Sequence, residues 1–175
     1  AVQKLPADAD FESVLDIYGI RYLTGGLASL RDLPDASVDF CWSNAVLEHV
    51  RRTEMPAILA ELRRVLKPDG VGSHVIDLRD HLGDSLNNLR FSERFWEAEW
   101  VARAGFYTNR LQASDYLRLF AESGFVTEII SSARWSRLPI ARQLLAPQFA
   151  KLSDEELMVR QLVVVLTPAP TLPGV

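Results

Sequence analysis

Two ionisable side chains stand close together where an apolar segment of the chain gives way to a polar one. Asp77 lies in the apolar segment Val71–Leu78, and His81 follows shortly after it. Histidine changes its charge near neutral pH and can accept a proton from a reacting group. We therefore predict His81 as a general base, with Asp77 as its catalytic neighbour. With Asp80 they also offer metal ligands, but without a second cluster a solvated loop is favoured, and no metal is expected.

Further candidates for chemistry lie in and after the long polar stretch that follows. Tyr107, Asn109 and Arg110 are predicted to line a substrate pocket, although Tyr107 fits a place in the core equally well. His74 lies in the middle of an apolar segment, which favours a buried, hydrogen-bonded histidine over a catalyst. The stretch Asp80–Arg110 as a whole is expected to act as a lid or as the acceptor-binding segment.

Composition limits the classes of protein that need to be considered. The 175 residues are 48% apolar and 24% charged, which is typical of one globular domain. A net charge of −4 argues against broad binding to nucleic acid. The longest aliphatic run, Leu162–Leu166, is too short to span a bilayer, so no membrane partner is expected. The only cysteine, Cys41, cannot form an internal disulfide, which fits a reducing cytoplasm.

The candidate elements alternate between helices and strands, which favours an α/β sheet. Helices are predicted at Asp10–Tyr18, Thr53–Leu66, Ser114–Ser123 and Ile140–Phe149, of which Thr53–Leu66 has the clearest apolar spacing, with Asp8 or Asp10, Thr53 and Ser114 as N-caps. A short helix is also predicted at Ser92–Arg103. Short apolar runs predict strands at Ile20–Thr24, Val38–Ser43, Val71–Leu78, Phe125–Ser131 and Arg160–Thr167. Between Leu78 and Ser114 the periodicity is weak, and a connection of this length is usually functional or disordered.

Several of these segments together resemble the class I S-adenosylmethionine-dependent methyltransferases, of the type 11 kind. The segment Leu33–Val50, LPDASVDFCWSNAVLEHV, resembles the family's fourth strand and following turn. Glu61–Gly70, ELRRVLKPDG, resembles its next helix, and Gly124-Phe125 resembles the junction before its sixth strand. The resemblance implies a Rossmann-like, mostly parallel sheet with an antiparallel final strand, over a partial domain at 1–167 and a tail at 168–175. DLRDHLGDSLNNLRFSERFWE and GFYTNRL also resemble a group of bacterial methyltransferase-like proteins.

The resemblance also implies where the cofactor, S-adenosylmethionine, would bind. Ligands of such sheets bind beyond the carboxyl ends of the strands. The implied cofactor contacts are Gly26, Ala28, Ser29 and Leu30 in one loop, Ser43, Asn44 and Ala45 in another, and His49. Simpler alternatives stay open: Gly25-Gly26 as a plain turn, Asn44 as a helix cap, and His49 as packing on a helix surface.

The family's first two strands have no counterpart in this sequence. Its glycine-rich turn, and the acid that holds the ribose hydroxyls, are missing with them. We therefore expect an N-terminally truncated domain that binds the cofactor weakly and is inactive alone. Ile20–Thr24 would then pair directly with Val38–Ser43, or leave that strand as an apolar edge open to self-association.

Together these patterns predict a function for the full-length protein. It would transfer a methyl group from S-adenosylmethionine to a small-molecule or protein acceptor, in the cytoplasm. Two other classes stay open. One is a methyltransferase-like fold that serves as a noncatalytic binding module. The other is a nicotinamide-dependent oxidoreductase, which shares the alternating order of elements.

Overall fold

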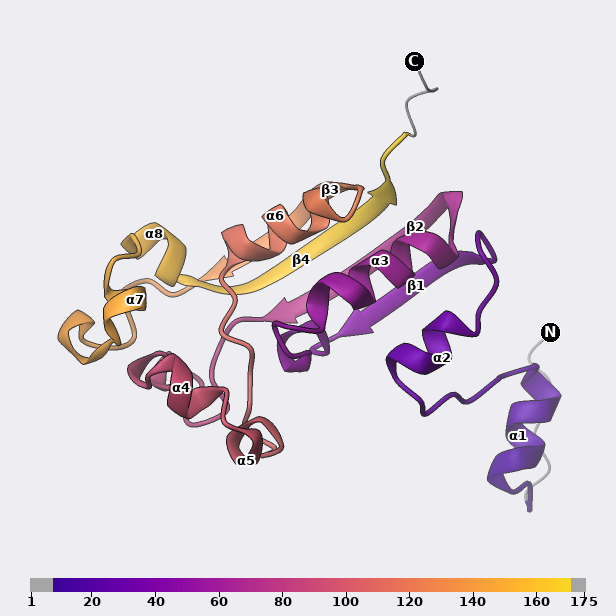
Figure 1. The fold of residues 1–175 in the computed structure, drawn as a ribbon, viewed down its shortest axis with the longest axis horizontal. Coiled ribbons are helices and arrows are strands. Elements are labelled where there is room, and N and C mark those ends of the chain that lie inside the picture. The colour runs from indigo at the N-terminus through magenta and orange to yellow at the C-terminus, as the bar shows by residue number, and fades with distance from the viewer. Residues whose placement is uncertain (1–7, 171–175) are drawn as a thin grey trace.

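A four-stranded open sheet forms the centre of the computed structural model, which describes residues 8–170 (Figure 1). The strand order is β1-β2-β4-β3, from β1 (Val38–Asn44) through β2 (Leu66–Asp77) and β4 (Val159–Pro168) to β3 (Phe125–Arg134). β1 and β2 pair in parallel, while β4 pairs antiparallel with both of its neighbours. Three strands thus share one direction and the final strand is reversed, as predicted. Because β4 stands between β2 and β3, only one strand pair is parallel.

Short helices make up most of the remaining elements. They are α1 (Phe11–Tyr18), α2 (Leu27–Arg31), α3 (Met55–Val65), α4 (Glu93–Trp96), α5 (Glu99–Ala102), α6 (Ala113–Glu122), α7 (Pro147–Ala150) and α8 (Asp154–Leu157), with the 3₁₀ helices η1 (Leu47–His49), η2 (Asn87–Arg90) and η3 (Arg142–Leu144). No helix within residues 8–170 is long and apolar enough to cross a membrane.

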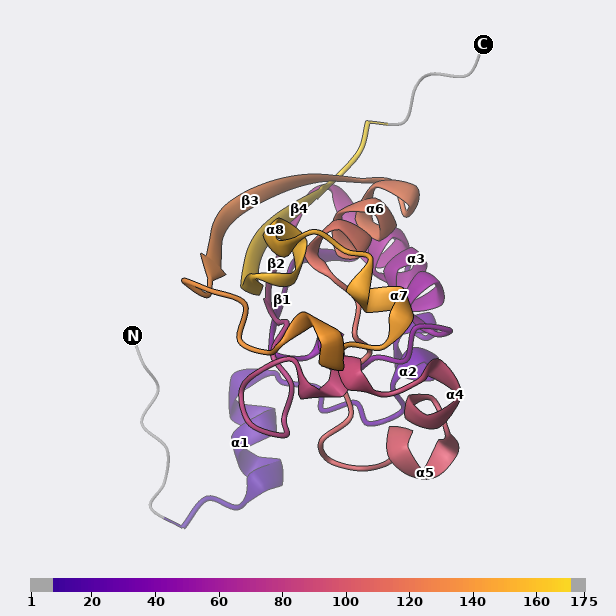
Figure 2. The ribbon, with the colours of Figure 1, turned by 90° about the vertical axis from the view of Figure 1, so that its left-hand side faces the viewer.

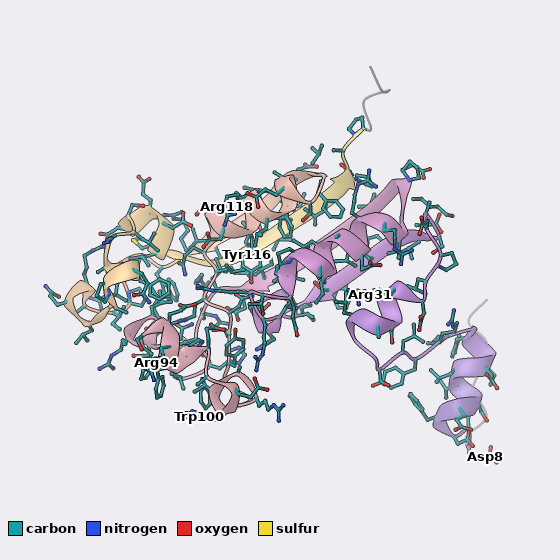
Figure 3. All side chains as sticks on the ribbon, in the orientation of Figure 1. Asp8, Arg31, Arg94, Trp100, Tyr116 and Arg118 are labelled. Carbon is teal, nitrogen blue, oxygen red and sulfur yellow. The ribbon has the colours of Figure 1, made fainter. Side chains whose placement is uncertain are left out.

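The main core lies between the sheet and helices α3 and α6, which cover one of its faces (Figures 1 and 2). Leu59 of α3 and Tyr116 of α6 are fully buried there against Ile76 and Val164 of the sheet. The two faces of α6 differ (Figure 3): Arg118 lies at the surface, while Tyr116 belongs to the core. The buried face of each helix follows the apolar spacing in the sequence.

β1 forms an edge of the sheet, and the predicted strand Ile20–Thr24 is wrong. Residues 20–24 form an irregular connection between α1 and α2, so they do not pair with β1. An extended segment becomes a strand only when a neighbour accepts its hydrogen bonds, and none lies beside it here. Two large apolar side chains of β1, Phe40 and Trp42, are 59% and 64% exposed. Self-association through this edge stays a prediction.

The helix boundaries differ from the predicted ones in several places. Asp10 caps α1, as one of two predictions had it, because its carboxylate accepts from the Ser13 N–H at 2.8 Å. Glu54, rather than Thr53, precedes α3, and Gln112, rather than Ser114, caps α6 through a capping box with Asp115. The predicted and observed helix starts differ by only one or two residues, because several neighbouring side chains can cap the same helix end.

Two predicted helices are broken, and the predicted tail starts too early. Ser92–Arg103 contains α4 and α5, separated by Ala98 in an extended conformation. Ile140–Phe149 contains η3 and the start of α7, since Ala146 is extended before Pro147. Pro168 still belongs to β4, and residues 171–175 lie outside the described part of the chain.

The segments between β2 and α6, and between β3 and β4, form a small layer of their own at one end of the sheet (Figure 1). Trp96, Val101 and Tyr107 make one buried cluster in it. Leu89 and Phe149 belong to a second cluster, which joins the two segments. The long connection after β2 is therefore packed and ordered, and it covers the sheet where β1 and β2 end.

Candidate functional site

The carboxyl ends of the parallel strands β1 and β2 bring two histidines together. In Figure 1 both arrowheads point toward the end of the molecule that holds α4, α5 and α7. The rings of His49, from η1 after β1, and His81, from the connection after β2, lie edge to face with centroids 4.9 Å apart. His49 Nδ1 donates a hydrogen bond to the Tyr107 carbonyl oxygen (2.8 Å), so in the neutral ring Nε2 is the free proton acceptor. Both side chains are exposed and can meet a substrate.

Asp77, at the end of β2, lies near enough to His81 to feel its charge, but its carboxylate is bound by Arg79. Arg79 Nε and an Arg79 terminal nitrogen donate to its carboxylate at 3.0 and 2.7 Å, and the Arg79 N–H donates at 3.0 Å. Burial opposes ionisation of Asp77, but these hydrogen bonds and the nearby charges of Arg79 and His81 outweigh it and lower its pKa. Asp77 is therefore a fixed negative charge near His81 rather than a proton acceptor.

Three of the predicted cofactor residues line one cavity, although they come from distant parts of the sequence. Gly26 and Leu30 of the α2 region and Ser43 of β1 share a mostly apolar hollow of about 380 Å³. Its other lining residues are Leu27, Cys41, Trp42, Val46, Leu47, Val50, Ile58, Leu62 and His74. Gly26 has a φ of +56°, a backbone conformation that favours glycine. This conformation also fits the simpler alternative, in which Gly25-Gly26 is only a turn.

The remaining predicted cofactor residues lie outside this cavity. The Ser29 hydroxyl accepts a hydrogen bond from Gly25 N–H (2.9 Å), and Ala28 is exposed on α2. Asn44 is exposed at the end of β1 and does not cap η1, which starts after Val46 without a side-chain cap. Ala45 has a φ of +52°, and its N–H donates to the Val75 carbonyl oxygen (2.9 Å).

The structure places the three predicted substrate residues in the interior. Tyr107, Asn109 and Arg110 are at most 3% exposed. The Asn109 amide nitrogen donates to the carbonyl oxygens of Leu47 and Val50, both at 2.9 Å. The Asn109 side-chain oxygen accepts from the Leu111 N–H and the Tyr116 hydroxyl, which leaves the side chain without a free polar group. The Tyr107 hydroxyl donates to Glu97 (2.9 Å), and its ring belongs to a core cluster, which matches the alternative interpretation.

The positive charge of Arg110 is enclosed by aromatic rings and carbonyl groups. Its guanidinium carbon lies 5.5 Å from the centre of the Trp96 ring and 5.1 Å from that of Phe149. It donates to the Phe91 carbonyl oxygen (2.8 Å) and to the Glu93 carboxylate (2.6 Å). Arg110 thus fastens the α4 segment and α7 to the strand ends.

Sequence reasoning missed two residues that hold the site together. Glu48 is only 1% exposed, and one of its oxygens accepts from the Asp77 N–H at 3.2 Å. Arg52 donates to the carbonyl oxygens of Asn109 (2.6 Å) and Arg110 (3.2 Å). An acid inside the apolar run AVLEHV was the available signal for Glu48, because such an acid needs buried partners.

His74 is the buried, hydrogen-bonded histidine that its position predicted. It is 2% exposed, and its Nδ1 forms a 2.8 Å hydrogen bond with the Ser43 hydroxyl. Its Nε2 lies 3.9 Å from the Cys41 sulfur, whose thiol pKa is itself raised by burial. Burial lowers the pKa of His74 to about 4, so the ring is neutral in the folded protein at neutral pH.

This lowered pKa predicts that mild acid weakens the fold. Between pH 6.5 and about 4 the unfolded chain binds a proton at His74 and the folded chain does not. The free energy of unfolding should therefore fall by up to about 3 kcal/mol as the pH drops through this range, and the contribution should level off below it. Urea titrations from pH 7 to pH 4 on the wild type and on His74→Gln measure the difference. Parallel curves for the two proteins would refute the prediction.

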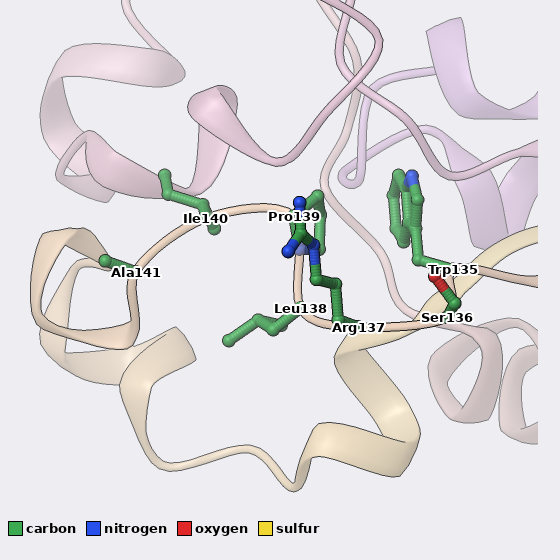
Figure 4. A pocket seen from close by; sticks show the side chains of 7 residues that line it. All are labelled: Trp135, Ser136, Arg137, Leu138, Pro139, Ile140 and Ala141. Carbon is green, nitrogen blue, oxygen red and sulfur yellow. The ribbon is translucent and has the colours of Figure 1, made fainter.

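Two other features of the described residues carry no site. The hollow of about 550 Å³ lined by residues 135–141 is formed by a single loop and contains none of the predicted site residues (Figure 4). The Asp80 carboxylate accepts from the N–H groups of Leu82 and Asn87, so it organises its own loop. Within residues 8–170, no three His, Cys, Asp or Glu residues are grouped to hold a metal ion.

Comparison with known proteins gives a consistent class for this arrangement. Residues 3–73 match the model of the methyltransferase domain family, while no curated protein matches the sequence. The YcgJ protein from Bacillus subtilis is similar in structure, with a TM-score of 0.55 and 16% identity over 91% of this chain and 77% of that one. A S-adenosylmethionine-dependent methyltransferase from Methanosarcina mazei has a TM-score of 0.51 and 15% identity, over 79% of this chain and 62% of that one.

A third similar structure is 1,6-didemethyltoxoflavin-N1-methyltransferase from Burkholderia thailandensis with bound 1,6-didemethyltoxoflavin and S-adenosylhomocysteine. Its TM-score is 0.52 at 15% identity, over 91% of this chain and 56% of that one. The chain therefore spans about three fifths of the length of the methyltransferases from M. mazei and B. thailandensis. Its fold is that of a class I methyltransferase-like domain.

Proposed function

We propose that the protein transfers a methyl group from S-adenosylmethionine to a small-molecule or protein acceptor, and that this chain supplies the acceptor side of the site. The observation that carries the proposal is the meeting of His49, His81 and Asp77 where β1 and β2 end. Ligands of open α/β sheets bind beyond these ends. The methyltransferase-domain match over residues 3–73 and the S-adenosylhomocysteine bound to the B. thailandensis enzyme support the choice of cofactor.

The cavity lined by Gly26, Leu30 and Ser43 fits one part of this cofactor. Its apolar walls suit the faces of a flat adenine base. None of the described residues that line it is acidic, so the cavity lacks the carboxylate that holds the ribose hydroxyls in related sheets. We assign the adenine end to this cavity, and we expect the contacts of this chain alone to give weak binding.

The chain's own residues would prepare the acceptor. When bound, S-adenosylmethionine supplies a methyl group on a positively charged sulfur, so the acceptor has to be held in line with it. His81 takes the proton of an acceptor that has to lose one, and His49 Nε2 offers a second acceptor for that proton. Asp77 stabilises the resulting imidazolium by its charge. We place the reaction in the cytoplasm, because the single cysteine is a free thiol.

Ligand titration followed by NMR tests the cofactor assignment on the 175-residue chain. Millimolar S-adenosylhomocysteine is expected to shift the amide signals of Gly26, Leu30 and Ser43, with a dissociation constant weaker than about 10 μM, equivalent to about −7 kcal/mol. Leu30→Glu should abolish these shifts by placing a charge in the apolar cavity. Leu144→Glu is the matched control, because Leu144 is 49% exposed on η3.

The other possible outcomes of this titration would either favour one of the two rival classes of protein or refute the cofactor assignment. Equal shifts with NAD⁺ would show only that the cavity takes the adenine group that both ligands carry, whereas clearly tighter binding of NAD⁺ would favour the nicotinamide-dependent oxidoreductase. No shifts with either ligand would overturn the adenine assignment. Shifts without methyl transfer by the full-length protein, over a broad panel of acceptors, would favour the noncatalytic binding module. An affinity tighter than about 10 μM would refute the division of cofactor contacts argued here.

A further inference from the structure

Three buried polar atoms without a hydrogen-bond partner belong to side chains that line one small cavity. They are Glu48 Oε2, Asn88 Oδ1 and Arg110 Nε, in residues that are 1%, 2% and 3% exposed. The residues come from three separate segments: η1, η2 and the stretch that leads into α6. Buried polar groups in folded proteins almost always have partners, so three orphans around one cavity need an explanation.

The other polar atoms of these side chains are already engaged. Glu48 Oε1 accepts from the Asp77 N–H (3.2 Å), and Asn88 Nδ2 donates to the Thr108 hydroxyl (2.9 Å). The two terminal nitrogens of Arg110 donate to the Phe91 carbonyl oxygen and to Glu93. Every other side-chain nitrogen and oxygen of the three residues therefore has at least one partner, and the three orphan atoms have none.

The size of the cavity limits what can occupy it. It leaves about 10 Å³ for the centre of a water-sized molecule, which is room for one water and too little for a substrate or a cofactor. The orphan atoms comprise one donor and two acceptors. A metal ion would meet the Arg110 cation, and a chloride ion would satisfy neither acceptor. A water molecule matches all three groups.

The geometry points to one ordered water molecule that accepts from Arg110 Nε and donates to Glu48 Oε2 and Asn88 Oδ1. This water joins the turn after β1 to both halves of the connection between β2 and α6. It thereby holds the covering layer against the strand ends where Asp77 lies. Burial raises the pKa of Glu48, although hydrogen bonds from backbone N–H groups oppose the rise. Water serves either form of this acid, because it accepts from a neutral carboxyl group as readily as it donates to a carboxylate.

A high-resolution crystal structure of the 175-residue chain is the direct test. A single density peak within about 3.2 Å of all three orphan atoms is the expected result. An empty cavity, or a direct hydrogen bond between Glu48 and Arg110, would overturn the inference.

NMR gives an independent test in solution. The Arg110 Nε–H signal is expected to show an Overhauser contact with a long-lived water. The contact should persist in Asn88→Asp, which keeps an acceptor, and disappear in Asn88→Leu, which removes the acceptor and fills the space. Absence of the contact in the wild type would contradict the inference, even if Asn88→Leu did not fold. Persistence of the contact in a folded Asn88→Leu would contradict it as well.

Discussion

Arg110→Ala is expected to lower the free energy of unfolding by roughly 3–5 kcal/mol, a large part of the total for a domain of this size. The side chain is completely buried, and its guanidinium lies over the rings of both Trp96 and Phe149. Truncation would leave the Phe91 carbonyl oxygen without its donor and open a cavity between two packed segments. Urea unfolding at pH 7 measures the loss.

Three further variants separate the causes of this loss. Arg118→Ala is the matched control, because Arg118 is an exposed arginine on α6 whose ion pairs should contribute little to stability. Arg110→Lys keeps the charge but loses the planar stacking, so it should recover less than half of the stability. Arg110 has a φ of +60°, so Arg110→Gly should be less damaging than Arg110→Ala by about 1 kcal/mol. An Arg110→Ala protein as stable as the control would contradict the role of Arg110 as a fastener.

His81→Gln is expected to lower kcat of the full-length protein by about 100-fold or more, with little change in KM. The reason is that His81 stands beside His49, near the fixed charge of Asp77, and the neutral amide cannot accept the proton of the acceptor. Transfer of a labelled methyl group from S-adenosylmethionine to the first acceptor found measures the rate. His49→Gln should have a smaller effect, because the His81 base remains.

Arg94→Gln is the control for this experiment. Arg94 is an exposed residue of α4 in the same covering layer (Figure 3), so its exchange should leave the rate unchanged. Full activity of His81→Gln would remove His81 from the mechanism. A large drop caused by Arg94→Gln would show that the layer as a whole, rather than the histidine, governs the rate.

Local patterns in the sequence determined the central elements of this fold. The apolar runs at Val38–Ser43, Phe125–Ser131 and Arg160–Thr167 all lie within strands, and the spacing of apolar residues found α3 and α6. These patterns are readable because a strand or helix with one buried face repeats its apolar side chains at its own period. The order of these elements, together with the resemblance, also predicted the reversed final strand.

Tertiary structure alone decided which of the candidate site residues are available for chemistry. His49 and His81 are separated by a whole helix and strand in the sequence, yet their rings touch. Arg110 and Asn109 are polar residues in a polar stretch, yet they are buried because Trp96, Phe149 and Tyr116 close over them. Burial of a polar residue depends on partners far along the chain, which local periodicity does not describe.

The same physical reason separates the strand that failed from those that formed. Ile20–Thr24 has the composition of a strand, but strand formation needs a hydrogen-bonding neighbour, and no described residue supplies one. The polar cavity of Glu48, Asn88 and Arg110 likewise exists only because three distant segments meet. The sequence by itself determined where apolar faces repeat. Only the tertiary structure decided which groups those faces enclose, because enclosure depends on contacts between residues that the order of the chain keeps apart.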